Sequence, residues 1–87
     1  MLIFREISIW RRSNETSAIR YACIHDVRTN LYAVQSADFF KLPINDEQLN
    51  YFSRQFVELF IEVPVRDRCS WHATIEEAIE VHDLDFS

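Results

Sequence analysis

The sequence predicts a single α+β domain in which a three-stranded antiparallel β-meander is followed by two helices. Three observations support this prediction. Residues 2–41 are rich in β-branched and aromatic side chains, in runs that short polar segments separate. Residues 45–83 instead repeat apolar side chains at a spacing of three to four, behind residues that commonly cap helices. The chain has 87 residues, the size of one domain with one modest core, so we expect residues 1–87 to fold as a unit.

The first part of the chain divides into three predicted strands and two turns. We place the strands at about residues 2–11, 18–28 and 31–38. The polar residues 13–17 suit a hairpin loop, and Thr29-Asn30 suits a two-residue turn because Asn tolerates positive φ. That turn would place Val27 opposite Tyr32, His25 opposite Val34 and Cys23 opposite Ser36. Polar and apolar side chains alternate along these strands, so we expect a sheet with one covered face.

A long helix is predicted at about residues 46–62. Asn45 can cap its start, and Gln48 is placed to close a capping box. Pro64 disfavours helical geometry in the residue before it, which sets the end of the helix. The apolar side chains form one stripe, which contains Leu49, Phe52, Phe56, Leu59 and Phe60.

A shorter helix is predicted at about residues 75–83. Thr74 can cap it, with Glu77 three residues later, and the acidic side chains of its first turn suit the helix dipole. We expect both helices to pack on one face of the sheet. Residues 65–73, which connect the helices, fit either a loop or a short strand.

The composition excludes several classes of function. The chain has no glycine, although average usage would give about six in this length. Phosphate-binding loops need glycine for close backbone approach, so we expect no nucleotide site of that kind and no cofactor. The sequence also predicts no membrane span and no signal peptide. Two cysteines are too few for a disulfide framework, so we expect a small cytoplasmic domain of bacterial type.

Charge is divided unevenly along the chain. Residues 1–41 carry six basic and four acidic side chains, a net charge of +2, whereas residues 42–87 carry three basic and ten acidic ones, a net charge of −7. Their sum is the net charge of −5. Such a division indicates something about partners and solubility rather than about the fold.

Aromatic and acidic side chains predict a surface that binds another protein. The chain has seven Phe, three Tyr and two Trp, which are many for its length. The candidates for contact are Trp10, Phe39, Phe40, Tyr51 and Trp71, with the helix carboxylates Glu76 and Glu80. Because Phe39 and Phe40 are adjacent, at most one of them can face the core if the strand continues. The predicted function is that of a non-catalytic, adaptor-like or inhibitor-like module that forms a homodimer.

Binding of single-stranded nucleic acid is the first alternative. Arg20 and Arg28 fall on one face of the second predicted strand, and Arg11 and Arg12 lie at a hairpin end beside Trp10. Basic and aromatic side chains on a sheet can contact phosphates and stack on bases. The net charge of −5 speaks against this function. Ion pairs with Asp26 and Glu6 explain the arginines more simply.

A small zinc-dependent or thiol enzyme is the second alternative. Cys23 and His25 point to the same side of a strand, and Cys69 with His72 would complete a set of two Cys and two His. Neither spacing is typical of structural zinc, and a small buried thiol explains Cys23 equally well.

Cys69 is also the candidate nucleophile. Arg66, Arg68 and His72 are its neighbours in the sequence, and positive neighbours lower the pKa of a thiol. Nothing in the sequence fixes the geometry that catalysis needs, so we predict that the chain is not an enzyme.

Overall fold

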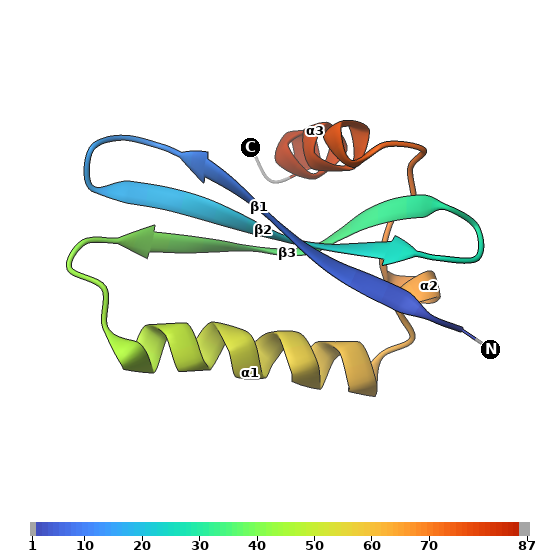
Figure 1. The fold of residues 1–87 in the computed structure, drawn as a ribbon, viewed down its shortest axis with the longest axis horizontal. Helices are drawn as coiled ribbons and strands as arrows, with labels where there is room; N and C mark the ends of the chain where they lie inside the picture. The colour runs from blue at the N-terminus through green and yellow to red at the C-terminus, as the bar shows by residue number, and fades with distance from the viewer. Residues whose placement is uncertain (1, 86–87) are drawn as a thin grey trace.

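The computed structural model describes residues 2–85, apart from the side chain of Arg66. It confirms the α+β class and the order of the elements: a three-stranded antiparallel sheet with strand order β1-β2-β3, followed by helices (Figure 1). The strands are β1 (Phe4–Arg12), β2 (Ser17–Asp26) and β3 (Leu31–Lys41), and the helices are α1 (Asp46–Glu62), α2 (Val65–Arg68) and α3 (Ile75–Asp85). Each predicted strand and helix is present, with its ends shifted by a few residues at most.

The two long helices begin at the caps that the sequence indicates. Asn45 Oδ1 accepts a 2.7 Å hydrogen bond from the backbone N–H of Gln48. Thr74 Oγ1 accepts one of 3.1 Å from the backbone N–H of Glu77. The Gln48 side chain does not turn back to the cap, because its amide donates to the carbonyl oxygen of Phe39 at 3.1 Å. The start of α1 is therefore tied directly to β3.

The segment between the long helices contains a short helix and a backbone bridge. Residues 65–68 form α2, and His72 then pairs with Tyr32 at the outer edge of β3. The Tyr32 N–H donates to the His72 carbonyl at 2.7 Å, and the His72 N–H donates to the Tyr32 carbonyl at 2.8 Å. The sequence allows a loop or a short strand for this segment; the structure shows one short helix followed by a loop that adds a single bridge to the sheet.

The register of β2 with β3 differs from the prediction. The structure places His25, and not Val27, opposite Tyr32, and Cys23 opposite Val34. The turn between these strands is longer than the predicted two residues, which moves the pairs next to the turn, from Cys23 to Asp26, by two positions. Because the shift is even, Cys23 and His25 still share a face with Tyr32.

Asp26 explains the longer turn. Its side chain is only 1% exposed, and its carboxylate accepts hydrogen bonds from the backbone N–H groups of Arg28 (3.0 Å) and Thr29 (3.4 Å). Asn30 has the positive φ that the prediction assigned to it, 59°. Its side-chain oxygen also lies 2.8 Å from His25 Nε2.

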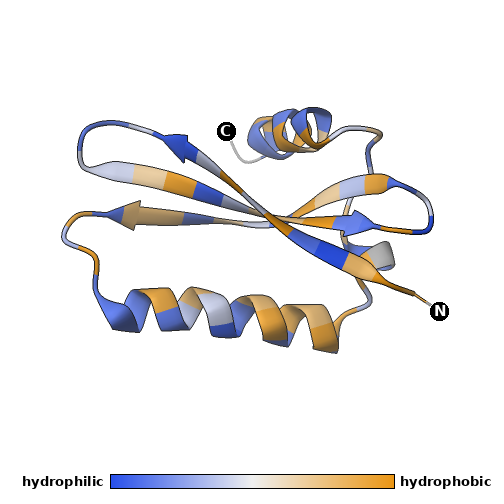
Figure 2. Cartoon of the chain, viewed as in Figure 1, coloured by the Kyte–Doolittle hydropathy of each residue, from blue (hydrophilic) through white to orange (hydrophobic). Residues whose placement is uncertain are grey.

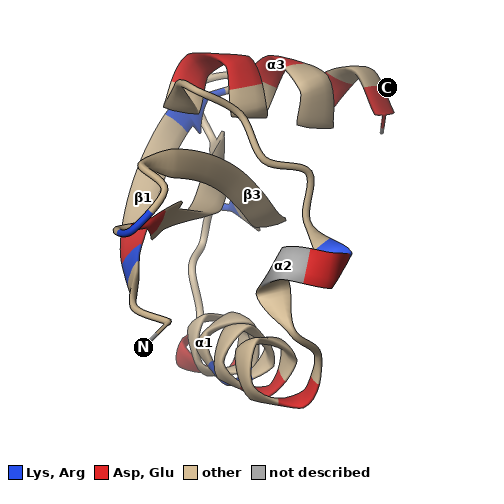
Figure 3. Cartoon of the chain, turned by 90° about the vertical axis from the view of Figure 1, so that its right-hand side faces the viewer, with Lys and Arg blue, Asp and Glu red and all other residues tan. Residues whose placement is uncertain are grey.

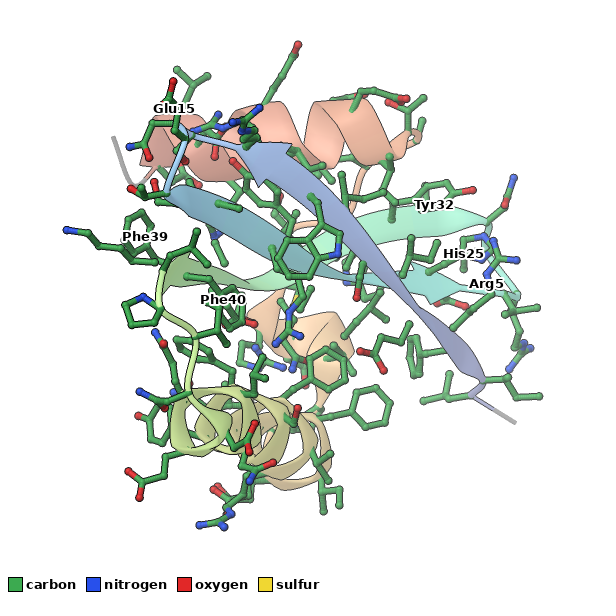
Figure 4. All side chains as sticks on the ribbon, turned by 60° about the vertical axis from the view of Figure 1, so that its left-hand side comes forward. Arg5, Glu15, His25, Tyr32, Phe39 and Phe40 are labelled. Carbon is green, nitrogen blue, oxygen red and sulfur yellow. The ribbon has the colours of Figure 1, made fainter. Side chains whose placement is uncertain are left out.

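A β-bulge decides which side chains of β3 face α1. Gln35 has no opposite residue on β2, so the alternation of β3 shifts at this point. Phe40 consequently faces α1, whereas Phe39 projects away from it (Figure 4). The Gln35 amide donates to the Phe56 carbonyl at 3.0 Å, and its oxygen accepts from Arg68 at 2.9 Å. These two bonds hold the bulge against α1 and α2.

The two long helices lie on opposite faces of the sheet, whereas the prediction placed both on one face (Figures 1 and 3). On one face, the Phe40 ring packs 5.2 Å from the Phe52 ring of α1. On the other, the Tyr21 hydroxyl donates to the Asp83 carboxylate of α3 at 2.9 Å. The reason lies in β2, where every residue from Tyr21 to Asp26 is buried. A central strand of this kind requires cover on both faces.

The helix α1 packs less closely than its apolar stripe suggests. None of its residues is fully buried, and the stripe is only half-buried. Tyr51, Val57 and Ile61 are exposed, and Figure 2 shows hydrophobic and hydrophilic segments alternating along the helix. No helix within residues 2–85 is long and apolar enough to cross a membrane. The sheet face that α1 covers is therefore incompletely filled.

Candidate binding surface

A groove opens between the end of the β1–β2 hairpin and the start of α1. We call it the hairpin groove. Its volume is about 340 Å³, and its apolar lining residues are Trp10, Ala18, Phe40, Leu42, Ile44 and Leu49. Trp10 is 56% exposed and Leu42 is 58% exposed. Exposed apolar side chains that gather at a concave surface are typical of binding sites.

Two smaller cavities lie on the same side of the sheet, between β1 and α1. Their volumes are about 210 and 170 Å³, and Glu6 and Phe56 line both. Phe4 and Phe60 also line the first cavity, and their rings meet edge to face with centres 5.8 Å apart. Arg20 lines the second cavity. The space beneath β1 is therefore only partly occupied by side chains of the same chain.

A buried ion pair supports the exposed indole of Trp10. The Nε and Nη2 atoms of Arg20 donate to the Asp38 carboxylate at 3.2 and 2.8 Å, and Asp38 is 5% exposed. The guanidinium carbon lies 5.7 Å from the Trp10 ring centre and 5.1 Å from the Phe40 ring centre. These cation–π contacts fix the position of the indole. The sequence indicates Asp26 and Glu6 as ion-pair partners of the arginines, and Asp38 was not among them. The bulge in β3 places Asp38 opposite Arg20.

Within residues 2–85, no other strand pairs with the outer side of β1, so this strand is an open edge of the sheet. Hydrogen bonds at its two ends, Val27 N–H to Ile3 (3.2 Å) and Ser13 N–H to Ser17 (3.0 Å), show which positions bond to β2. Bonded positions alternate in an antiparallel pair, so the odd-numbered residues of β1 bond to β2. The even-numbered residues present their N–H and C=O groups outward; they are Phe4, Glu6, Ser8, Trp10 and Arg12. Figure 4 shows β1 in front of the other strands, with α3 above and α1 below.

Several residues predicted for protein contact lie at the surface. Trp10, Phe39 and Tyr51 are exposed, as are Glu76 and Glu80 on the outer side of α3. Trp10 alone among these aromatic residues lines the hairpin groove. The five residues therefore do not form one continuous patch.

Two predicted contact residues lie inside the fold instead. Phe40 is 4% exposed and packs against Trp10 and Phe52, because the bulge turns it toward α1. Trp71 is half-buried, with its ring stacked on that of Phe4 at 6.1 Å. Phe40 therefore supports the groove from within.

The arginines of the nucleic-acid alternative do not form one basic face. Arg20 is held in its buried ion pair, and Arg11 pairs with Asp83 of α3 at 3.2 Å. Arg12 neighbours Arg11 on a strand, so the two point to opposite faces. Arg28 lies in the turn after β2, and Figure 3 shows the basic residues dispersed over the strands and α2.

The predicted zinc ligands are not assembled. Cys23 is fully buried, and burial raises the pKa of its thiol to about 11. The His25 ring stacks on Tyr32 at 4.5 Å. Within residues 2–85, no three Cys, His, Asp or Glu side chains converge in a way that could hold a metal ion. Cys23 and His25 therefore do not meet Cys69 and His72 in such a group.

Cys69 lies in a setting that raises its pKa. It lines a second cavity of about 340 Å³ beside α3, together with Arg68 and His72. Burial raises the pKa of the Cys69 thiol, although the charge of Arg68 acts in the opposite direction. The predicted lowering of the pKa is therefore outweighed by desolvation. The Arg66 side chain, also invoked in that prediction, lies outside the described residues.

The His72 ring bonds to groups other than Cys69. Its Nε2 lies 2.8 Å from Ser70 Oγ, and its Nδ1 lies 3.4 Å from Glu77 Oε1. Ser70 and Glu77 are both exposed. Ser70 is only two residues from His72, so a local bond of this kind is expected in a loop. We interpret the chain of bonds as one that holds the loop against the start of α3.

Comparison with known proteins gives no relative from which a function could be transferred: no protein-family model, curated protein or solved structure matches this chain. The geometry must therefore carry the functional argument. Two neighbouring surface features offer groups that a partner could bind: the outward N–H and C=O groups of β1, and the apolar side chains of the hairpin groove. We refer to them together as the β1 surface.

Proposed function

We propose that this chain is a non-catalytic protein-binding domain that holds an extended segment of its partner along β1. The open edge of β1, with five outward backbone positions beside an apolar groove, is the observation that carries the proposal. A segment that adds a strand to a sheet gains main-chain hydrogen bonds, and its alternate side chains reach the neighbouring pockets. Long open edges are usually covered in native proteins.

The side chains around the edge indicate the chemistry of the bound segment. Trp10 and Leu42 offer apolar area on the α1 side, where aromatic anchors contribute most to affinity. Arg12 is exposed on the same side and suits a carboxylate of the partner. The segment we expect is therefore extended, with an acidic side chain opposite Arg12 and uncharged ones near Trp10.

The replacement Ser8→Pro tests the proposal. Proline removes one outward N–H of β1 without touching a bond to β2, and an edge position tolerates it. Ser8→Ala is the matched control, since it removes the same hydroxyl and keeps the N–H. We expect proteins retained from an extract of the cells of origin by immobilised wild type and Ser8→Ala, and lost with Ser8→Pro. Equal retention by all three would show that binding does not use the β1 edge.

A further inference from the structure

We infer that the segment held along β1 is β1 of a second copy of this chain, paired antiparallel about a two-fold axis that passes beside Ile9. The inference rests on the proposed function and names its partner. It places the two sheets side by side as one six-stranded sheet. Three features of the molecule support this dimer: the alternation of outward and β2-bonded residues along β1, the charges along β1, and the partial cover of the opposite edge of the sheet.

Two-fold symmetry limits the registers that are possible. An axis perpendicular to the sheet keeps each face on its own side, so side chains on the α1 side of one strand must lie opposite α1-side side chains of the other. The axis must then pass at a single residue of β1, so that this residue lies opposite its own copy, and not at the midpoint between two residues. In every such register, the even-numbered residues of one β1 lie opposite even-numbered residues of the other. Their outward N–H and C=O groups can therefore form hydrogen bonds in each of these registers. The side chains must therefore select the register.

The charges along β1 favour the centre at Ile9. This centre places Glu6 opposite Arg12 of the partner subunit, and symmetry repeats the pair. Both side chains are exposed and lie on the α1 side of the strand. Oppositely charged cross-strand pairs stabilise a sheet, and like charges directly opposite one another destabilise it. Arg11 then lies opposite Ile7 of the partner subunit, so no like charges face each other.

The neighbouring centres are less favourable. A centre at Ser8 would place Arg5 opposite Arg11 of the partner subunit twice, which opposes like charges. A centre at Ile7 would place Glu6 opposite Ser8 of the partner subunit and would leave no oppositely charged pair. A centre at Trp10 would place Arg12 opposite Ser8 of the partner subunit and would likewise leave no oppositely charged pair within β1. Only the centre at Ile9 gives oppositely charged pairs, so the charges favour that register.

The dimer pairs the open β1 edges of the two copies with each other. Its two outer strands are both β3, whose outer side already carries the Tyr32–His72 bridge and the Gln48 bond to Phe39. Ile9, which is half-buried in one copy, meets its own counterpart at the axis. The assembly therefore closes after two copies, as expected of an isologous interface.

Cysteine cross-linking measures the register directly. Ile9 bonds to β2, so Ile9 and its counterpart form a non-hydrogen-bonded pair with Cα atoms about 4.5 Å apart, within the range that a disulfide spans. Two copies of residue 7 would lie about 13 Å apart in this register, which is too far. We therefore expect Ile9→Cys to form a covalent dimer on mild oxidation, whereas Ile7→Cys and the wild type, with Cys23 and Cys69, do not.

Exchange of the paired charges provides a second measurement that does not depend on oxidation. Glu6→Arg and Arg12→Glu each place like charges opposite one another, and we expect each to raise the dissociation constant of the dimer about tenfold or more. The double variant Glu6→Arg/Arg12→Glu restores both pairs and is expected to return to the wild-type constant. Sedimentation at a series of concentrations gives the constants, and circular dichroism checks that each variant is folded.

The outcomes separate this inference from the proposed function. Cross-linking through residue 9 with recovery in the double variant supports the dimer. A monomeric wild type at every concentration, or cross-linking through residue 7 in place of 9, overturns it. Loss of other proteins with Ser8→Pro would still support the proposed function in that case, whereas equal retention by Ser8→Pro and Ser8→Ala would contradict the proposed function itself.

Discussion

The two edges of the sheet, β1 and β3, differ in how far the rest of the chain covers them. The outer edge of β3 receives the backbone of His72 at Tyr32, and the side chain of Gln48 at Phe39. The outer edge of β1 receives no such cover in residues 2–85, although β1 is nine residues long. The helices account for the difference, because the chain after β3 returns along β3 and not along β1. The uncovered edge of β1 is the edge that we propose for a partner.

The largest change in stability is expected when proline replaces a residue of β1 whose N–H bonds to β2. Ile7→Pro removes an N–H that bonds to β2 and should lower the free energy of unfolding by about 3 kcal/mol or more. Ser8→Pro removes an outward N–H and should lower it by about 1 kcal/mol or less. Urea unfolding of both variants provides the measurement. Equal losses would show that both residues bond within the sheet and that β1 is not an open edge.

The next effect compares two adjacent residues of β3. Phe40→Ala should lower the free energy of unfolding by about 3 kcal/mol, since it empties a space between Trp10 and Phe52. Phe39→Ala, at an exposed site, should change it by less than about 1 kcal/mol. Thermal and urea unfolding give both values. A larger loss for Phe39→Ala would contradict the shift of alternation at Gln35.

The helices and strands could be predicted from the sequence because their signals are local. Asn45 and Thr74 cap the helices within three residues of the groups that they bond. The pairing of Arg20 with Asp38 and the burial of Phe40 could not be predicted, because both depend on one unpaired residue, Gln35. The side of the sheet that each helix covers depends on long-range packing around β2. The strand order of the predicted meander is confirmed, and it places β1 at an edge of the sheet. The use of that edge for binding was not predicted.

A smaller effect is expected from the ionisation of Cys23 at high pH. Burial raises the pKa of this thiol from 9.0 to about 11, so folding favours the protonated form. Its contribution to stability is present in full below pH 9 and is lost as the pH rises toward 11, by about 2 kcal/mol at most. Urea unfolding at pH 8 and pH 10.5 measures the loss, and Cys23→Ala should reduce it. The same loss in Cys23→Ala would assign the effect to other groups, such as the Tyr21 hydroxyl, whose pKa is also raised.

The smallest effect concerns the closure of the β3 edge by α1. Gln48→Ala removes the hydrogen bond to the Phe39 carbonyl but keeps the backbone N–H that Asn45 caps. We expect a loss of about 1 kcal/mol in the free energy of unfolding. Asn50→Ala, at an exposed position of the same helix, is the control and should change little. Faster exchange of β3 amides in Gln48→Ala alone would confirm that this side chain protects the edge.

Amide hydrogen exchange along β1 tests the central claim most directly. The odd-numbered residues, 5 to 11, bond to β2 and should be protected at every protein concentration. The even-numbered residues 6 to 12 should exchange rapidly in dilute protein and become protected as the concentration rises, because β1 of a second copy then supplies their partners. Rapid exchange of the even-numbered amides at all concentrations would contradict the account, as would protection that does not depend on concentration.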